Sequence, residues 1–284
     1  MLEDRGVLLA DGALGTNFQD MGIEPGVAGE EWVFDAPGQV TTHHRRFVDA
    51  GCDLVLTCSF GGSSVRLEDG PLTGRARELN TRAAQLAREA VGGDILVAGS
   101  MGPTGQLAEP LGPLTRDACL SAFSEQAQAL ADGGADLLVL ETFFALDEAL
   151  WAIEAIGAVT ELPLVMSFSF DQGTKTMMGL SPADVTAATR SLGLAALGLN
   201  CGRSLDDTEH LVSEFLEADM TCPLWVKPNA ACPRWSPTGS SIPRIPSHSP
   251  PEWGSSPTQG ANIVGGCCGS TPSHLTALAG AIGR

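Results

Sequence analysis

The stretch Ile263-Val264-Gly265-Gly266-Cys267-Cys268-Gly269 places a short apolar run directly before two glycines and two adjacent cysteines. Adjacent side chains on an extended chain point to opposite faces, so two thiols can aim at one point only if the chain bends. The three glycines permit such a bend because they lack a Cβ atom. The stretch therefore predicts a strand that ends in a pair of converging thiols.

The same arrangement, an apolar run that ends in polar side chains, recurs along the chain. Eight runs are predicted to be strands, and they begin at Val7, Asp53, Ile95, Asp136, Leu164, Ala195, Leu224 and Ala261. Helical patterns separate most of them, over residues 39–50, 74–91, 115–132, 147–159, 204–218 and 271–282, with another helix starting at Ser181. Runs that are apolar on both faces are typical of parallel strands covered by helices.

Eight such units in 284 residues predict an α/β fold, a single (β/α)8 TIM barrel domain over residues 1–284. An open doubly wound sheet is the alternative, but no phosphate-cradling glycine fingerprint follows the first run. One segment departs from the barrel pattern. Residues 233–258 are rich in Ser and Pro, and each interior Pro costs a helix about 3 kcal/mol. We expect the helix between strands seven and eight to be irregular or missing.

In a barrel of this kind, the active site lies at the carboxyl ends of the strands. Nearly every predicted strand ends there in a polar side chain, and these side chains are Asp11, Thr57, Ser59, Ser100, Glu141, Thr142, Asn200, Cys201, Asn229, Cys267 and Cys268. Singly, each has a structural explanation, such as an Asp-Gly turn or a helix cap. Together on one rim they predict a functional site.

The cysteines in this set predict a metal site. Two thiolates are half of a tetrahedral zinc site, and Cys201, which also ends a strand beside a glycine, offers a third ligand. A catalytic zinc keeps three protein ligands and one open position, whereas a structural zinc has four. Small buried thiols and a strained disulfide between Cys267 and Cys268 are the alternatives on spacing alone.

Other candidate residues receive a structural interpretation. His43 and His44 lie in a predicted helix beside two arginines and are expected on its solvated face. Met177 and Met178 are expected to pack within a loop. The remaining cysteines at helix or loop positions are expected to be structural, and these are Cys52, Cys119, Cys222 and Cys232.

Composition limits the partners. A formal net charge of -18 disfavours a nucleic-acid backbone or an anionic membrane as a partner. The chain opens with no basic segment followed by an apolar one, and no apolar run is long enough to span a bilayer, so we expect a cytoplasmic protein with reduced thiols. The sequence contains no Tyr, which excludes any mechanism that needs a phenol.

Seven motifs, in order along the chain, resemble the homocysteine S-methyltransferase family. They begin at Asp11, Thr57, Ala98, Glu141, Asn200, Lys227 and Gly265, and they cover nearly the whole chain except about 232–260. In detail the chain is similar to bacterial betaine–homocysteine methyltransferases and to the homocysteine module of cobalamin-dependent methionine synthase.

The resemblance implies a (β/α)8 barrel in which Cys201, Cys267 and Cys268 hold Zn²⁺ and the sulfur of homocysteine binds the metal. It places Glu141 and Asp11 near the substrate amino group, with Thr57 and Ser59 holding the rest. Thr142 and Asn200 complete the expected substrate-binding set. The implied reaction moves a methyl group from a betaine-like onium donor to homocysteine and gives methionine.

The donor is the open point. Animal betaine-using members have a Tyr where this chain has Gly61, so Trp32 is the candidate aromatic face for an onium group. S-methylmethionine and a cobalamin-carrying partner protein are the alternative methyl sources, and the chain is also a candidate homo-oligomer. A non-catalytic zinc-binding barrel with impaired activity is the competing class of function.

Overall fold

A computed structural model describes residues 2–230 and 260–284 of the chain. Its eight strands form one sheet in the order β1-β8-β7-β6-β5-β4-β3-β2, and every neighbouring pair is parallel. The strands are β1 (Leu8–Leu9), β2 (Leu54–Leu56), β3 (Leu96–Met101), β4 (Leu137–Phe143), β5 (Leu164–Phe168), β6 (Ala196–Cys201), β7 (Leu224–Pro228) and β8 (Ile263–Val264).

The sheet closes on itself between its first and second strands. Ala10 forms a parallel bridge with Leu54, and the backbone N–H of Asp53 donates to the carbonyl of Leu9 at 2.7 Å. The closed order confirms the predicted (β/α)8 barrel. The predicted irregularity over residues 233–258 lies outside the described residues.

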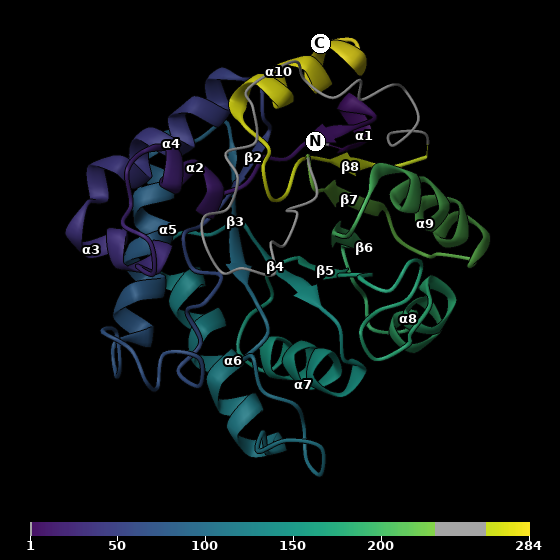
Figure 1. Cartoon of the computed structure of the whole chain (residues 1–284), viewed down its shortest axis with the longest axis horizontal. Helices are drawn as coiled ribbons and strands as arrows, with labels where there is room; N and C mark the ends of the chain where they lie inside the picture. The colour runs from purple at the N-terminus through teal and green to yellow at the C-terminus, as the bar shows by residue number, and fades with distance from the viewer. Residues whose placement is uncertain (1, 231–259) are drawn as a thin grey trace, which may run out of the picture.

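Helices surround the strands as an outer ring (Figure 1). The helices are α1 (Leu2–Arg5), α2 (Gly15–Asp20), α3 (Trp32–Asp35), α4 (Pro37–Asp49), α5 (Ala76–Val91), α6 (Arg116–Asp132), α7 (Leu146–Gly157), α8 (Pro182–Thr189), α9 (Leu205–Glu217) and α10 (Pro272–Ala281), with a 3-10 turn at Gly29–Glu31 before α3. Thr115 caps α6 by accepting the N–H of Ala118, and Ser181 caps α8 by accepting that of Asp184. Both caps confirm the helix starts expected from the sequence.

Alternation along the strands builds two separate apolar regions. Leu54, Val139, Val165 and Trp225 belong to a cluster made almost entirely of strand residues, which fills the barrel interior. Their neighbours along each strand point outward and pack with helix residues in a second, larger cluster. Both faces of the sheet are therefore buried, as the continuous apolar runs predicted.

The next inward positions toward the carboxyl ends of the strands are polar. Two residues beyond Ala98, Val139, Val165, Gly198 and Trp225 stand Ser100, Glu141, Ser167, Asn200 and Lys227, respectively. The top of the barrel interior is therefore a polar layer on an apolar core, and it forms the floor of the candidate site.

The opposite end of the barrel is tied together by Asp53. Its carboxylate is buried and accepts hydrogen bonds from the guanidinium groups of Arg5 and Arg284 and from the backbone N–H of Leu9. The side chain thus joins the segments before β1 and after α10 to the start of β2. Charge-assisted hydrogen bonds of this kind are about twice as strong as neutral ones.

Replacing this carboxylate should destabilise the barrel. We expect Asp53→Asn to lower the free energy of unfolding by roughly 1.5–3 kcal/mol, because it removes the charge that two arginines contact. Asp132→Asn is the matched control, since Asp132 makes an ion pair with Arg77 on the surface, and it should change stability by less than about 0.5 kcal/mol. Urea unfolding measures both, and equal losses in the two variants would contradict the role of Asp53.

Candidate active site

Three cysteine sulfurs meet at the carboxyl ends of β6 and β8. The Sγ atoms of Cys201, Cys267 and Cys268 all lie within 4.8 Å of one another, and those of Cys201 and Cys267 are 3.0 Å apart. All three residues are partly exposed, and all seven cysteines in the described ranges are free thiols. The predicted convergence is therefore present, and Cys267 and Cys268 form no disulfide with each other.

Backbone contacts hold the turn that carries Cys267 and Cys268. The N–H of Gly265 donates to Val226, that of Gly266 to Asp11 and that of Cys267 to Pro228, with N···O distances of 3.0, 3.0 and 2.8 Å. A Cβ on Gly265 would lie 2.8 Å from the carbonyl oxygen of Asp11, and one on Gly266 would lie 2.3 Å from Ser270 Oγ. These two glycines serve close packing, and only Gly269, at φ 79°, adopts a left-handed conformation.

Hydrogen bonds among the three thiols favour the deprotonated, thiolate form of Cys268. Because Cys201 and Cys267 donate to it, the pKa of Cys268 falls to about 3. The donor role raises the pKa of Cys201. The thiolate is the form that binds metal and acts as a nucleophile.

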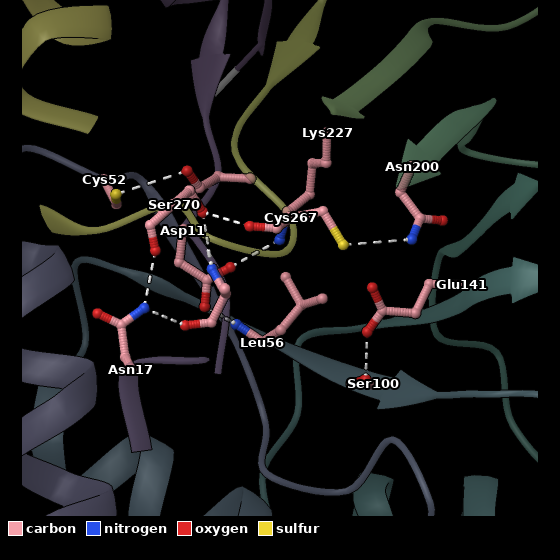
Figure 2. Close-up of polar contacts among 12 residues, drawn as sticks. Asp11, Asn17, Cys52, Leu56, Ser100, Glu141, Asn200, Lys227, Cys267 and Ser270 are labelled. Carbon is pink, nitrogen blue, oxygen red and sulfur yellow. Dashed lines mark hydrogen bonds and ion pairs between the residues drawn. The ribbon is translucent and has the colours of Figure 1, made fainter. Parts of the chain in front are cut away.

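A buried ion pair lies beside the thiols. Lys227 Nζ donates to Asp11 Oδ1 at 2.8 Å, and both side chains are at most 3% exposed. The second oxygen of Asp11 accepts the backbone N–H of Leu56 at 2.8 Å. Burial lowers the pKa of Lys227, but the carboxylates of Asp11 and Glu141 outweigh it and raise that pKa overall. Figure 2 shows Asp11, Lys227 and Cys267 together at the end of the barrel.

Glu141 faces the same space from β4. Its carboxylate accepts a short hydrogen bond from Ser100 Oγ, and burial raises its pKa to about 7 (Figure 2). The strand register shifts between Leu140 and Phe143, and Thr142 has φ 66°. Such bulges re-aim side chains and are common next to active sites.

Hydroxyl groups from the loop after β2 contact the backbone of β3 beside Glu141. Thr57 Oγ1 lies 2.6 Å from Ser59 Oγ and accepts the N–H of Ser100 at 2.9 Å, while Ser59 Oγ donates to the carbonyl of Ser100 at 2.7 Å. Both side chains are buried. These bonds fix the loop after β2 against β3.

Trp32, the predicted aromatic face for the donor, begins α3 and is partly buried. Its ring centroid lies 4.7 Å from that of Phe18, where it packs against a separate apolar cluster. The 3-10 turn that precedes it rests on the loop after β2, since Glu30 accepts the N–H of Gly61 at 2.6 Å. Trp32 therefore belongs to the segment that covers the β2 side of the rim.

Lys227, Ser167 and Ser270 were missed as site residues by sequence reasoning. Lys227 appeared there only as part of a family motif, although its place two residues after Trp225 puts it on the inward face of β7. Ser167 likewise stands two residues after Val165, which puts it on the inward face of β5. Ser270 Oγ, which accepts the N–H of Ala13 and donates to the carbonyl of Cys267, follows β8 and has no such periodic signal.

Two structural expectations were wrong. His43 and His44 are buried, because they share the inner face of α4 with Val40 and Phe47 at helical spacing. Burial lowers the pKa of His44 to about 4. Met177 and Met178 do not pack within their loop but are 61% and 43% exposed.

The other predicted structural cysteines can be placed in part. Cys52 and Cys119 are buried, and Cys222 is partly buried. Cys232 lies outside the described residues. Across the part of the chain that the structure describes, no helix is long and apolar enough to cross a membrane.

The sequence model described as homocysteine S-methyltransferase matches residues 8–282. The chain therefore belongs to the homocysteine S-methyltransferase family, as its motifs indicated.

Named relatives agree with this assignment. The chain is 30% identical to methionine synthase from Mycobacterium leprae (strain TN) and 29% identical to methionine synthase from Mycobacterium tuberculosis (strain ATCC 25618 / H37Rv). These alignments cover 98% and 97% of this chain but 24% of each relative, so the chain spans about a quarter of their length.

Solved structures support the fold. The homocysteine methyltransferase MmuM from Escherichia coli superposes in its metallated form with a TM-score of 0.78 and 24% identity, covering 98% of this chain and 96% of that one. Its apo form gives a TM-score of 0.73 and 25% identity, covering 99% and 98%.

The raised pKa of Glu141 predicts a pH-dependent stability. Between its ordinary pKa of 4.5 and about 7, the folded protein keeps the proton that the unfolded chain releases, so stability falls as pH rises. In protein treated with a chelator, Glu141→Gln should become more stable than the parent over this window, by on the order of 3 kcal/mol at pH 7 and above.

Urea unfolding at a series of pH values from about 4 to 8 measures this difference. Glu154→Gln is the control, because the carboxylate of Glu154 is paired with Arg116 on the surface. Its unfolding free energy should run parallel to that of the parent. Parallel curves for Glu141→Gln as well would contradict the effect of burial.

Proposed function

We propose that this protein is an enzyme that transfers a methyl group from an onium donor to the thiol of homocysteine, giving methionine, with the help of Zn²⁺. The observation that carries the proposal is the meeting of Cys201, Cys267 and Cys268 at the carboxyl rim of a barrel of this family. We further propose that residues 1–284 make up one barrel domain and that the protein acts in the cytoplasm.

The three thiols fit a zinc ion. Sulfurs bound to one tetrahedral zinc at about 2.3 Å stand about 3.8 Å apart. The three sulfurs here all lie within 4.8 Å of one another, and those of Cys201 and Cys267 are 3.0 Å apart, so small side-chain rotations bring them to that spacing. Among the described residues, no His, Asp or Glu joins this cluster as a fourth ligand. Three protein ligands leave an open position, which is the arrangement of catalytic rather than structural zinc.

Bound zinc would hold the sulfur of homocysteine as a thiolate at neutral pH. The chain's own residues then have the task of orienting the substrate. Glu141 and Asp11 supply the negative charge for its ammonium group, with Glu141 presented by the bulged end of β4. Thr57, Ser59 and Thr142 line the same rim, where their bonds fix the loops that face the substrate.

The reaction itself is an in-line displacement. The homocysteine sulfur forms a bond to the donor methyl carbon as the bond from that carbon to the positively charged nitrogen or sulfur of the donor breaks. The electron pair of the broken bond stays on that nitrogen or sulfur, which thereby becomes neutral. No general base is required in this step, because the thiol proton has already left. The barrel contributes alignment of the two reactants and exclusion of water.

The onium donor is favoured by the charge of the site. Asp11, Glu141 and the thiol of Cys267 act on Lys227, the one cationic side chain in this group of described residues. An aromatic face can add cation–π attraction, and Trp32 on the β2 side of the rim is the proposed one. S-methylmethionine, or a methyl group carried by a cobalamin protein, is the alternative source. The name of the relatives, methionine synthase, agrees with methionine as the proposed product.

A non-catalytic zinc-binding barrel is the competing function. It would bind metal through the same thiols without turning over substrate. The two functions differ in whether a methylated product forms.

We expect the purified protein to hold one zinc per chain and to methylate homocysteine. Cys267→Ala should lose both the zinc and the activity, because the two remaining thiols are too few ligands to hold the metal. Cys222→Ala is the matched control, since Cys222 lies outside the thiol cluster, and it should keep both. Metal analysis is combined with product detection using betaine, S-methylmethionine, dimethylsulfoniopropionate and methylcobalamin as donors.

Full zinc occupancy in Cys267→Ala would contradict the assignment of Cys267 as a zinc ligand. Normal zinc in the parent with no product from any donor would favour the non-catalytic barrel.

A separate prediction distinguishes the residues that bind homocysteine from those that bind the donor. Glu141→Gln should raise KM for homocysteine about ten- to a hundred-fold, because it removes a charge-assisted hydrogen bond worth roughly 1.5–3 kcal/mol, and should spare the donor. Trp32→Ala should raise KM for an onium donor and leave KM for homocysteine unchanged. Steady-state kinetics with each substrate varied in turn decides it. If both variants affect the same substrate, at least one residue is misassigned.

A further inference from the structure

The side-chain oxygen of Asn200 is held by two donors. The backbone N–H of Thr142 lies 2.8 Å from Asn200 Oδ1, and Ser167 Oγ lies 2.7 Å from the same atom. A backbone N–H can only donate, so the atom that faces it must be the oxygen of the carboxamide. The orientation of the Asn200 amide is therefore fixed by the main chain of β4.

The amide nitrogen consequently points toward the thiols. Asn200 Nδ2 lies 2.7 Å from Thr142 Oγ1, 3.6 Å from Cys201 Sγ and 3.7 Å from Cys267 Sγ. Figure 2 shows its contact with Cys267. One N–H thus bonds the threonine hydroxyl, and the other is shared between two sulfurs.

This arrangement uses the whole hydrogen-bonding capacity of the side chain. A carboxamide has two acceptor lone pairs and two N–H donors, and all four are engaged within the protein. Asn200 is also 1% exposed. In this conformation the side chain has no donor or acceptor left for a substrate, which favours a supporting role over the substrate-binding role predicted from the sequence.

Two residues with strained backbone conformations lie next to this carboxamide. Thr142 and Cys201 have φ values of 66° and 62°, in the left-handed region that side chains with a Cβ rarely adopt. Both residues contact Asn200. Strain of about 1–3 kcal/mol per residue persists only where surrounding bonds hold it, and it clusters at functional sites.

We propose that Asn200 is a positioning residue for the metal-binding thiols. Its N–H group sets the orientation of the Cys201 and Cys267 sulfurs and withdraws negative charge from them, while Thr142 and Ser167 hold the carboxamide in place. This deepens the proposed function, on which it rests, because the electron density of these sulfurs tunes the metal that binds the substrate thiol.

Cobalt(II) in place of zinc gives a readout that a purely structural role would not move. Asn200→Leu removes the N–H donors, so the sulfurs become more electron-rich, and their charge-transfer band to cobalt should shift to longer wavelength. Cobalt affinity should fall by roughly ten- to a hundred-fold. Asn80→Leu is the matched control, because Asn80 is equally buried on α5 and bonds the carbonyls of Gly62 and Ala76, and it should leave the band in place.

Ser167→Ala is a milder variant that serves if Asn200→Leu does not fold. It loses one bond that holds the carboxamide oxygen but keeps both N–H donors, so cobalt should bind several-fold more weakly with the band unmoved. An unmoved band in folded Asn200→Leu, or unchanged cobalt affinity in Ser167→Ala, would overturn the proposal.

No homocysteine is present in this measurement. A shifted band in a protein that makes no methionine would leave Asn200 as the positioning residue and remove only the proposed reaction. Conversely, an active enzyme with an unmoved band would remove only the role of Asn200.

Discussion

The buried ion pair between Asp11 and Lys227 joins the segment after β1 to the end of β7. In the sheet, β8 lies between these two strands, and its turn is bonded on both sides, to the carbonyl of Asp11 and to that of Pro228. The ion pair thus spans the strand whose turn carries Cys267 and Cys268. Burying two charges costs solvation that their attraction only partly recovers, so the pair's contribution is better understood as geometry than as stability. It ties the end of β1 to the end of β7, which is the neighbour of β6, the strand that carries the third thiol.

The same pair also sets the charge of the site. Lys227 is a buried cation beside Asp11, Glu141 and Cys267, and it offsets part of their repulsion. What remains is a negative region on a rim built from strand ends. Such a region suits an ammonium group and a positively charged donor, and it disfavours anions. Orientation therefore comes from the barrel, whereas chemical reactivity depends on what the thiols hold.

Most of the fold was predictable from the sequence because it depends on local patterns. Apolar runs that end in polar residues identified the eight strands, and glycines beside Cys201 and Cys267 predicted that the thiols converge. What escaped prediction depends on partners far along the chain. Lys227 is buried only because Asp11, which is distant in sequence, lies opposite it. His43 was placed on the solvated face because of its arginine neighbours, although its spacing from Val40 and Phe47 marks the inner face of α4. The orientation of Asn200 follows from a single backbone N–H on another strand, which no sequence pattern reveals.

The central claim is that three thiols from two strand ends hold a zinc ion with one position open to the substrate sulfur. Zinc X-ray absorption on the purified protein, before and after addition of homocysteine, tests it most directly. We predict three sulfur neighbours at about 2.3 Å without substrate and four with it. A shell with fewer than three sulfurs, or a sulfur count that homocysteine leaves unchanged, would contradict the account.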